Sequence, residues 1–299
     1  MQPNGGARRL RELLLGAEPI VAPGSYDGLS ARLVEQAGFP AVYMTGFGAS
    51  ASLLGRPDVG LLSFGEMAGH ARRLVQAVAI PVIADADDGY GNPLNVVRTV
   101  REYEAAGVAA LHIEDQVSPK RCGHMAGKEV IAASEMVEKV RAAVEARRSP
   151  ELVIIARTDA RAVHGLDEAL ERARRYRDAG ADMLFVEAPE SEDEVALVAE
   201  AFPDTPMLFN WVEGGRSPAV AHERLRELGY RVVICPLSAL LAASSAVGRI
   251  LARIREDGTP AGIAGELPAF AEFTSVVGMP DAERLEARFA AEPGQADAP

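Results

Sequence analysis

Two polar stretches of this sequence contain residue types that are able to do chemistry. The first is ADADDGYGN, residues 84–92, in which Asp85 and Asp87 follow the apolar run IPVI. The second is IEDQVSPKRCGH, residues 113–124, in which Glu114 follows the apolar run AALHI. Carboxylate oxygens without a histidine or thiolate cluster favour a hard divalent cation, Mg²⁺ or Mn²⁺, over zinc. The alternative is that these carboxylates cap the N-termini of helices, as aspartate often does.

The second stretch continues into a polar loop that contains a cysteine. Cys122 stands among Lys120, Arg121, Gly123 and His124. Positively charged neighbours lower the pKa of a thiol, and the loop position allows the thiol to give or take a proton. A functional thiol therefore fits this loop better than an inert buried cysteine does.

Polar residues also end several other apolar runs. Arg157 ends LVIIART, where its guanidinium is able to hold a substrate carboxylate in a bidentate pair. The alternative is a structural ion pair with Asp159 or another carboxylate. The remaining polar residues at such ends are Tyr43, Thr45, Glu187 and Asn210.

Eight apolar runs alternate with helix-periodic stretches, and this alternation predicts the scaffold. Four times a charged helical stretch ends at a glycine and is followed by an apolar run, as in ERARRYRDAG before ADMLFV. The predicted strands are 20–23, 41–45, 81–85, 110–114, 152–157, 183–187, 207–210 and 232–236, and the predicted helices are 26–37, 64–78, 93–106, 134–146, 166–179, 192–201 and 219–228. Continuous apolar strands are typical of parallel sheets. The pattern favours a (β/α)₈ barrel over a doubly wound sheet, because polar residues end nearly every strand.

A helical arm follows the eighth predicted strand. We expect one barrel domain over residues 1–299, with the arm at about 237–291 and a disordered tail, EPGQADAP. The helical run 236–256 is more apolar than a surface helix needs, and short helices are predicted at 269–275 and 281–290. The arm packs either on a neighbouring subunit or back on its own barrel.

Composition excludes several classes of function. The 299 residues have a net charge of −12 and no basic cluster with aromatic residues, which argues against nucleic acid as a partner. No apolar stretch reaches the roughly 20 residues that span a bilayer, and residues 1–20 are interpreted as containing an amphipathic helix. Two cysteines in the whole chain indicate a reduced, cytoplasmic location. No Gly-rich dinucleotide fingerprint follows the first strand.

We expect no catalytic role for the other cysteine or for the histidines outside the polar loop. Cys235 and His112 lie inside predicted strands and are expected in the core, whereas His70, His164 and His222 fall in helical or loop stretches and are expected in solvent.

The chain resembles the isocitrate lyase/phosphoenolpyruvate mutase superfamily. The resemblance is carried by DADDGYGN, KRCGH, GSYDGLSARLVEQAGFPAVYMTG, IIARTDA, FNWVEGG and CPLSAL. It is greatest for the shorter members: methylisocitrate lyase, 2,3-dimethylmalate lyase, the plant oxaloacetate-cleaving enzymes and carboxyphosphonoenolpyruvate mutase.

The resemblance implies a barrel whose eighth helix is exchanged between subunits of a homotetramer, and a small carboxylate as substrate. It implies that KRCGH is a mobile gate and that Cys122 is the general acid, with Tyr43, Lys120 and His124 as further catalytic residues. It maps the Mg²⁺ site to Asp85 and Asp87, with Asp58 and Glu114 nearby, and substrate contacts to Thr45, Gly46, Phe47, Gly123, Arg157, Glu187 and Asn210.

The implied activity is cleavage of a carbon–carbon bond in a 2-hydroxy di- or tricarboxylate, giving an oxo acid such as pyruvate. Three positions depart from the lyase pattern. Thr45 and Phe47 replace smaller residues of many lyases, and Met125 stands where methylisocitrate lyases tend to have arginine. These departures favour a 2-alkylmalate over a tricarboxylate. Formation of a P–C bond by a mutase, or cleavage of oxaloacetate, is the alternative, since the mutases share KRCGH.

Overall fold

The computed structural model of this chain describes residues 5–290, and their core is a closed barrel of eight parallel strands. Each strand pairs with the next along the chain, and β8 pairs with β1 to close the barrel. The strands are β1 Ile20–Ser25, β2 Val42–Met44, β3 Val82–Asp85, β4 Ala110–Glu114, β5 Val153–Thr158, β6 Met183–Val186, β7 Met207–Asn210 and β8 Val232–Cys235. The predicted (β/α)₈ fold is therefore confirmed.

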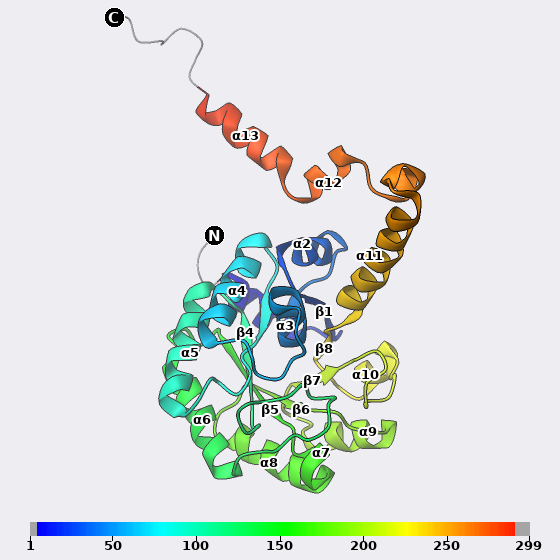
Figure 1. The fold of residues 1–299 in the computed structure, drawn as a ribbon. Coiled ribbons are helices and arrows are strands. Elements are labelled where there is room, and N and C mark those ends of the chain that lie inside the picture. Colours follow the sequence, from blue (N-terminus) through cyan, green and yellow to red (C-terminus); the bar gives the residue numbers. More distant parts are fainter. Residues whose placement is uncertain (1–4, 291–299) are drawn as a thin grey trace, which may run out of the picture. The chain divides into compact units, whose positions relative to one another are not determined.

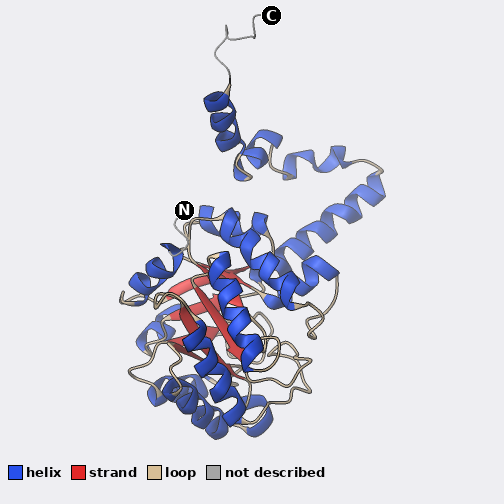
Figure 2. Ribbon diagram, turned by 90° about the vertical axis from the view of Figure 1, so that its left-hand side faces the viewer, coloured by secondary structure: helices blue, strands red, loops and turns tan. Residues whose placement is uncertain are grey.

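Helices surround the strands on the outside of the barrel (Figures 1 and 2). The helices of this part are α1 Gly5–Leu14, α2 Gly28–Gln36, α3 Gly46–Leu54, α4 Phe64–Ala77, α5 Pro93–Ala106, α6 Ala133–Ala146, α7 Arg161–His164, α8 Leu166–Asp178, α9 Glu192–Ala201 and α10 His222–Glu227. Helix α1 is the amphipathic helix predicted near the N-terminus, and it buries Ala7 and Leu10.

The hydrophobic core has two layers because each strand has two buried faces. One cluster fills the barrel interior and includes Ile83, Ile155 and Phe185. The other lies between strands and helices and includes Leu111 and Tyr176. This two-sided burial explains why the strands are continuous apolar runs in the sequence.

Two short helices were absent from the sequence-based assignment. Helix α3 begins directly after β2 and is rich in glycine, alanine and serine, so it has no clear apolar stripe. The Thr45 side chain accepts a hydrogen bond from Gly48 N at its start, and Gly55 ends it in the left-handed conformation, with φ 61°. Helix α7 is a single turn after β5. Local capping therefore marks α3, whereas α7 has no side-chain cap and is too short to give a periodic signal.

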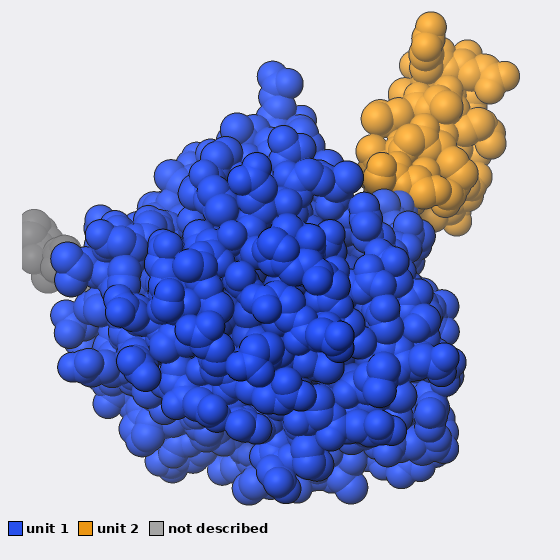
Figure 3. All heavy atoms as spheres, turned by 90° about the horizontal axis from the view of Figure 1, so that it is seen from below, with its two compact units in different colours: residues 1–243 blue, residues 244–299 orange. Residues whose placement is uncertain are grey.

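The chain divides into two compact units, residues 1–243 and residues 244–299 (Figure 3). Helix α11, Ser238–Asp257, crosses this boundary. The second unit continues with a 3₁₀ helix Pro260–Glu266, α12 Phe270–Val276 and α13 Met279–Phe289, close to the predicted helical bounds. The predicted disordered tail, 292–299, lies outside the described residues. Within residues 5–290, no helix is long and apolar enough to cross a bilayer.

Candidate active site

A small cavity lies where the strands reach their carboxyl ends. Its volume is about 40 Å³. Most of the predicted site residues line it, and they come from four strands, from the segments that follow β2, α3 and β6, and from the loop between β4 and α6. They are Tyr43, Thr45, Phe47, Asp58, Asp85, Lys120, Cys122, Gly123, His124, Arg157, Glu187 and Asn210. The other three, Gly46, Asp87 and Glu114, contact residues of this lining.

Asp85 is buried at the end of β3 and is held by backbone donors. Asp87 N donates to its Oδ1 over 2.9 Å, and Gly46 N donates to its Oδ2 over 3.2 Å. A Cβ at Gly46 would lie 2.4 Å from Asp85 Oδ2, so only glycine permits this approach. Burial favours the protonated acid, yet neighbouring His112, Lys120 and Arg157 lower the pKa of Asp85 to about 2. The side chain is therefore an anion at neutral pH.

These carboxylates do not cap helices, so the capping alternative is wrong for them. Asn92 caps α5 with its side chain, and α6 starts after Ala132 without a side-chain cap. Asp85 and Glu114 therefore lie at the strand ends without a capping role.

Lys120 joins two further carboxylates. Its Nζ lies 2.8 Å from Asp58 Oδ1 and 2.6 Å from Asp87 Oδ1. Burial raises the pKa of Asp87 to about 7, and the nearby Asp85 and Asp58 act in the same direction. Asp87 also has φ 47°, a left-handed backbone that is uncommon outside glycine and is often found at functional sites.

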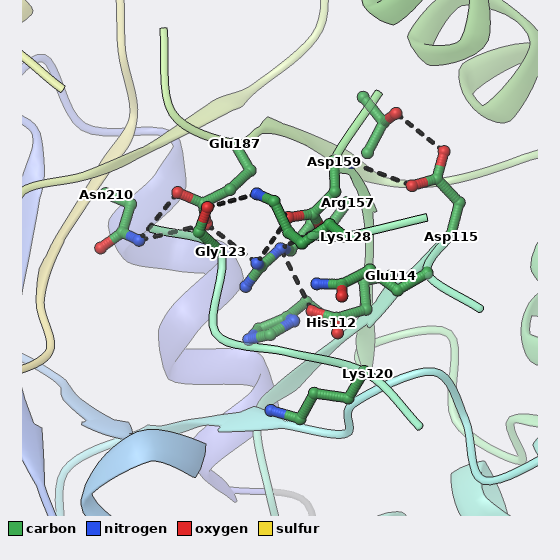
Figure 4. A network of polar contacts seen from close by, with 12 residues as sticks. His112, Glu114, Asp115, Lys120, Gly123, Lys128, Arg157, Asp159, Glu187 and Asn210 are labelled. Atoms are coloured by element: carbon green, nitrogen blue, oxygen red, sulfur yellow. Dashed lines mark hydrogen bonds and ion pairs between the residues drawn. The ribbon is translucent and has the colours of Figure 1, made fainter. Parts of the chain in front are cut away.

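Arg157 is the centre of the ion-pair network in Figure 4. Its Nε lies 3.2 Å from Glu114 and 2.9 Å from Asp159, and its Nη2 lies 3.2 Å from Glu187. The structural ion pair with Asp159 therefore exists, and Arg157 lines the cavity as well. Asn210 Nδ2 donates to Glu187 over 3.2 Å, which links β7 to the same network.

The two adjacent acids at the end of β4 have opposite surroundings. Glu114 contacts Arg157, its Oε1 has no hydrogen-bond partner, and burial raises its pKa well above the usual range. Asp115 turns away from Arg157 (Figure 4). It accepts hydrogen bonds from Thr158 Oγ1, Tyr176 and the backbone of Asp159. Asp115 therefore supports the scaffold instead of the cavity.

Residues 120–124 of the segment 117–129 line the cavity, and we call this segment the gate. Its base is closed by an antiparallel bridge between Gln116 and Val130. Inside it, Lys128 Nζ donates to Gly123 O and lies 2.8 Å from Asp159 Oδ1. A Cβ at Gly123 would lie 2.4 Å from Arg157 Nη2. The gate therefore packs directly onto the strand-end residues.

Cys122 lies at this contact, and its thiol is protonated. Burial raises its pKa to about 11, and Asp58 and Glu187 add to the increase. The sequence-based expectation of a lowered thiol pKa is wrong, because Lys120 is neutralised by its own carboxylates while burial dominates around the sulfur. A protonated thiol suits a proton donor.

His124 connects the gate to two other loops. Its Nδ1 accepts a hydrogen bond from Arg216 N over 2.9 Å, so its proton belongs on Nε2, which lies 3.2 Å from Glu187 Oε1. The ring thus bridges the segment after β6 and the loop after β7.

The other histidines and the second cysteine partly follow expectation. His164 and His222 are exposed, as predicted, and His112 is fully buried, 2.8 Å from Tyr43 Oη. The solvent assignment of His70 is wrong, because its face of α4 packs inward and leaves it 2% exposed. Cys235 is only partly buried at the end of β8, so its core assignment holds only in part.

Two residues of the site carried no sequence signal. Lys128 follows the KRCGH motif in an ordinary GKE context, and Arg216 stands in a loop without a periodic pattern. Both act through backbone and ion-pair contacts that only the folded chain reveals.

The donor set fits a hard divalent cation. Three cations, Lys120, Lys128 and Arg157, face six carboxylates, namely Asp58, Asp85, Asp87, Glu114, Asp159 and Glu187. Glu114 Oε1 also lacks a partner. Within the described residues, no three Asp, Glu, His or Cys side chains converge as a metal cluster. Mg²⁺ suits such a site, because it keeps several waters and needs few direct protein ligands.

Comparison with known proteins places these motifs in a family. The family model described as phosphoenolpyruvate phosphomutase matches residues 10–255. The chain is 47% identical to 2,3-dimethylmalate lyase of Eubacterium barkeri, over 95% of this chain and 98% of that protein. It is 43% identical to 2-methylisocitrate lyase of Aeropyrum pernix, over 93% and 89% of the two chains. It is 42% identical to a chloroplastic carboxyvinyl-carboxyphosphonate phosphorylmutase of Arabidopsis thaliana, over 90% and 80%.

Solved structures agree with these relatives. A crystal structure of 2,3-dimethylmalate lyase superposes with a TM-score of 0.92 at 40% identity and covers 99% of both chains. A phosphonopyruvate hydrolase in complex with oxalate and Mg²⁺ gives a TM-score of 0.87 at 32% identity, over 95% of this chain and 99% of the other. The predicted enzyme class, a carbon–carbon lyase, agrees with the lyases among the relatives. The chain belongs to the isocitrate lyase/phosphoenolpyruvate mutase superfamily.

Proposed function

We propose that this enzyme cleaves a carbon–carbon bond in a 2-hydroxy dicarboxylate of the 2-alkylmalate type, with 2-methylisocitrate as the larger candidate. The products are an oxo acid such as pyruvate and a second carboxylate. The observation that carries the proposal is Cys122, a protonated thiol that lines the same small cavity as Asp85 and Arg157.

The substrate's carboxylates would be held by the cationic side of the cavity. Arg157 presents a guanidinium at the cavity wall, and Asn210 and His124 add donors beside it. These donors contact Glu187, so a bound carboxylate would compete with an internal partner. Charge-assisted bidentate pairs give such a site its preference for carboxylates.

A divalent cation is part of this proposal, held by Asp85 and Asp87 with Asp58 and Glu114 nearby. When bound, Mg²⁺ or Mn²⁺ would stabilise negative charge on the hydroxyl and carboxylate oxygens of the substrate. Support comes from the excess of carboxylates over cations and from the superposed hydrolase that holds Mg²⁺.

The bond-breaking step needs one proton taken and one proton given. The substrate hydroxyl loses its proton to one of the surrounding carboxylates, and the C–C bond breaks as the new C=O bond forms. The electron pair stays on the carbon next to the other carboxylate, and Cys122 gives that carbon its proton. The raised pKa of Cys122 keeps this proton available at neutral pH.

The gate must move for substrate to enter. A cavity of about 40 Å³ has room for only a few water molecules, well below the size of a dicarboxylate. Closure over a bound substrate would exclude water until the carbanion is protonated. The smaller 2-alkylmalates are favoured as substrates by the wall residues Thr45 and Phe47. They are also favoured by Met125, which follows His124 in the gate.

A substrate panel tests this function. Wild type is assayed with 2,3-dimethylmalate, 2-methylmalate, 2-methylisocitrate and oxaloacetate, with Mg²⁺, and oxo-acid release is followed by a coupled lactate dehydrogenase. We expect release from a 2-alkylmalate and loss of activity with EDTA that Mg²⁺ restores. Absence of oxo acid from the 2-hydroxy acids would refute the lyase assignment. Direct detection of acetate and oxalate from oxaloacetate would indicate the hydrolase alternative.

The second candidate is a mutase that forms a P–C bond. It is favoured by the similarity to the Arabidopsis phosphorylmutase, which covers 90% of this chain. A ³¹P NMR signal for a new P–C bond, made from a carboxyphosphonate substrate, would support the mutase. Absence of this signal in an enzyme that releases an oxo acid from a 2-hydroxy acid would exclude the mutase.

The predicted assembly and location also belong to the proposal. We propose one barrel domain with its C-terminal arm, acting in the cytoplasm as a homotetramer that exchanges α11. The support is the set of exposed apolar side chains in residues 244–290, which includes Leu251, Phe270 and Phe289. Light scattering of the purified chain measures the predicted oligomeric state.

A further inference from the structure

The loop after β7, residues 211–221, is hydrogen-bonded to the gate at His124. Arg216 N donates to His124 Nδ1 over 2.9 Å, and Arg216 Nε donates to His124 O over 3.4 Å. The loop thus touches both the ring and the backbone of one gate residue. It is also tied at its own base, where Trp211 Nε1 donates to Val220 O over 3.2 Å.

The contact is close because the neighbouring residue is glycine. A Cβ at Gly215 would lie 2.7 Å from His124 Nδ1 and 3.0 Å from Val212 Cβ. Gly215 does not have a positive φ, so its backbone conformation accepts alanine. The glycine is therefore required by the approach of the His124 ring rather than by the turn.

Arg216 is connected to the barrel through Glu190. Its Nη1 lies 3.5 Å from Glu190 Oε1, and Arg161 Nη1 lies 2.7 Å from the same oxygen. Arg161 is in turn paired with Glu194 of α9 over 2.6 Å. The loop after β7 is thereby linked to the helices that follow β5 and β6.

Holding His124 also holds the turn that contains the thiol. Met125 N donates to Cys122 O over 2.8 Å, so residues 122–125 form one tight turn. His124 Nε2 faces Glu187 on the opposite side of the ring. The ring is thus fixed from both sides, and the thiol two residues away shares its position.

We propose that Gly215 and Arg216 form a latch that holds the gate closed by fixing His124, and that they act as positioning residues for Cys122. This inference rests on the proposed gate role of residues 117–129. The latch selects the Nε2–H form of His124 through the backbone N–H of Arg216, and it releases the gate when the His124 ring leaves Gly215.

Thiol labelling without substrate tests the latch independently of any lyase activity. The protein is treated with N-ethylmaleimide, and the rates at Cys122 and Cys235 are followed by peptide mass spectrometry. Cys235, at the end of β8, is the internal reference for general loosening. The ratio of the Cys122 rate to the Cys235 rate reports on gate opening.

Two variants weaken the latch, and each has a matched control. Gly215→Ala places a methyl group against His124, and we expect the ratio to rise roughly tenfold or more. Arg216→Ala removes the side-chain contacts but keeps the backbone donor, and we expect a rise of about twofold to tenfold. Gly69→Ala, where an added Cβ meets nothing within 4 Å, and Arg224→Ala, an exposed arginine paired with Glu192, should leave the ratio unchanged.

The latch is refuted if Gly215→Ala leaves the ratio at the wild-type value, or if its matched control raises it equally. If Gly215→Ala fails to fold, the labelling ratio of Arg216→Ala is compared with that of its control, Arg224→Ala. An equal ratio in these two variants would refute the latch. If the substrate panel shows no lyase activity, the labelling result still tests the latch, because the labelling reaction needs no turnover.

Discussion

Glu114 and Asp115 are neighbours in sequence, yet they lie in two regions that satisfy a buried carboxyl group to different degrees. Asp115 lies in the layer between strands and helices, where Thr158, Tyr176 and Arg172 satisfy its carboxylate. Glu114 faces the barrel axis, where one oxygen lacks a partner and its pKa is raised by burial. The outer layer satisfies its buried charges. The strand-end cavity gathers six carboxyl groups around three cations and leaves Glu114 Oε1 without a partner, an arrangement typical of ligand-binding sites.

The largest effect is expected on the cavity side of this comparison. Cys122→Ala removes the proposed proton donor, and we expect oxo-acid release to fall by about 10²–10⁴-fold. The thermal midpoint should fall by only a few degrees, because Cys122→Ala removes a single sulfur atom. Steady-state kinetics and a thermal melt measure the two quantities. Undiminished turnover would remove Cys122 from the reaction and leave the metal site standing.

The outer layer should respond in the opposite way. Asp115→Ala removes the buried carboxylate partner of Arg172 and leaves it only the more exposed Glu168, and we expect the free energy of unfolding to fall by roughly 3 kcal/mol. Denaturant unfolding measures the loss, and Asp178→Ala, an exposed acid on α8, is the control. A stability close to that of wild type would show that the network around Asp115 is dispensable.

Glu114→Gln is expected to change the free energy of unfolding less than Asp115→Ala does. Burial raises the pKa of Glu114, so a neutral amide of the same shape should leave the free energy of unfolding unchanged or slightly higher. Activity should fall at the same time, since the amide cannot serve as a carboxylate ligand. A clear loss of stability would mean that the ion pair with Arg157 is mainly structural.

The smallest effect concerns His70 in the outer layer. Burial lowers its pKa, so the unfolded chain binds a proton at a higher pH than the folded chain does. Its contribution to stability is therefore present above the unfolded pKa of about 6.5 and is lost as the pH falls. In His70→Leu, the decrease in the free energy of unfolding between pH 7 and pH 5 should be smaller than in wild type. An identical decrease would exclude His70 as its source.

The barrel was predictable because its determinants are local and repeated. Four of the helices end near a glycine, as at Gly107 and Gly180, and the strands are apolar on both faces, so order and handedness follow from general rules. Helix α3 was missed because its small residues have no stripe and only the Thr45 cap marks its start.

The composition of the cavity was predictable, but its electrostatics were not. Strand ends converge in any barrel, which explains why Asp85, Glu114 and Arg157 were found from position alone. The raised pKa of Cys122 and the contact between Arg216 and His124 depend on packing between loops far apart in sequence. Such packing leaves no periodic signal in a single sequence.

Cleavage of 2,3-dimethylmalate in D₂O with Mg²⁺, followed by NMR, tests the proposed lyase reaction most directly. We expect pyruvate and propionate in equal amounts, with one deuterium on the carbon next to the propionate carboxylate, because a carbanion there takes its proton from an exchangeable thiol. Unchanged substrate, or propionate without deuterium at that carbon, would contradict it.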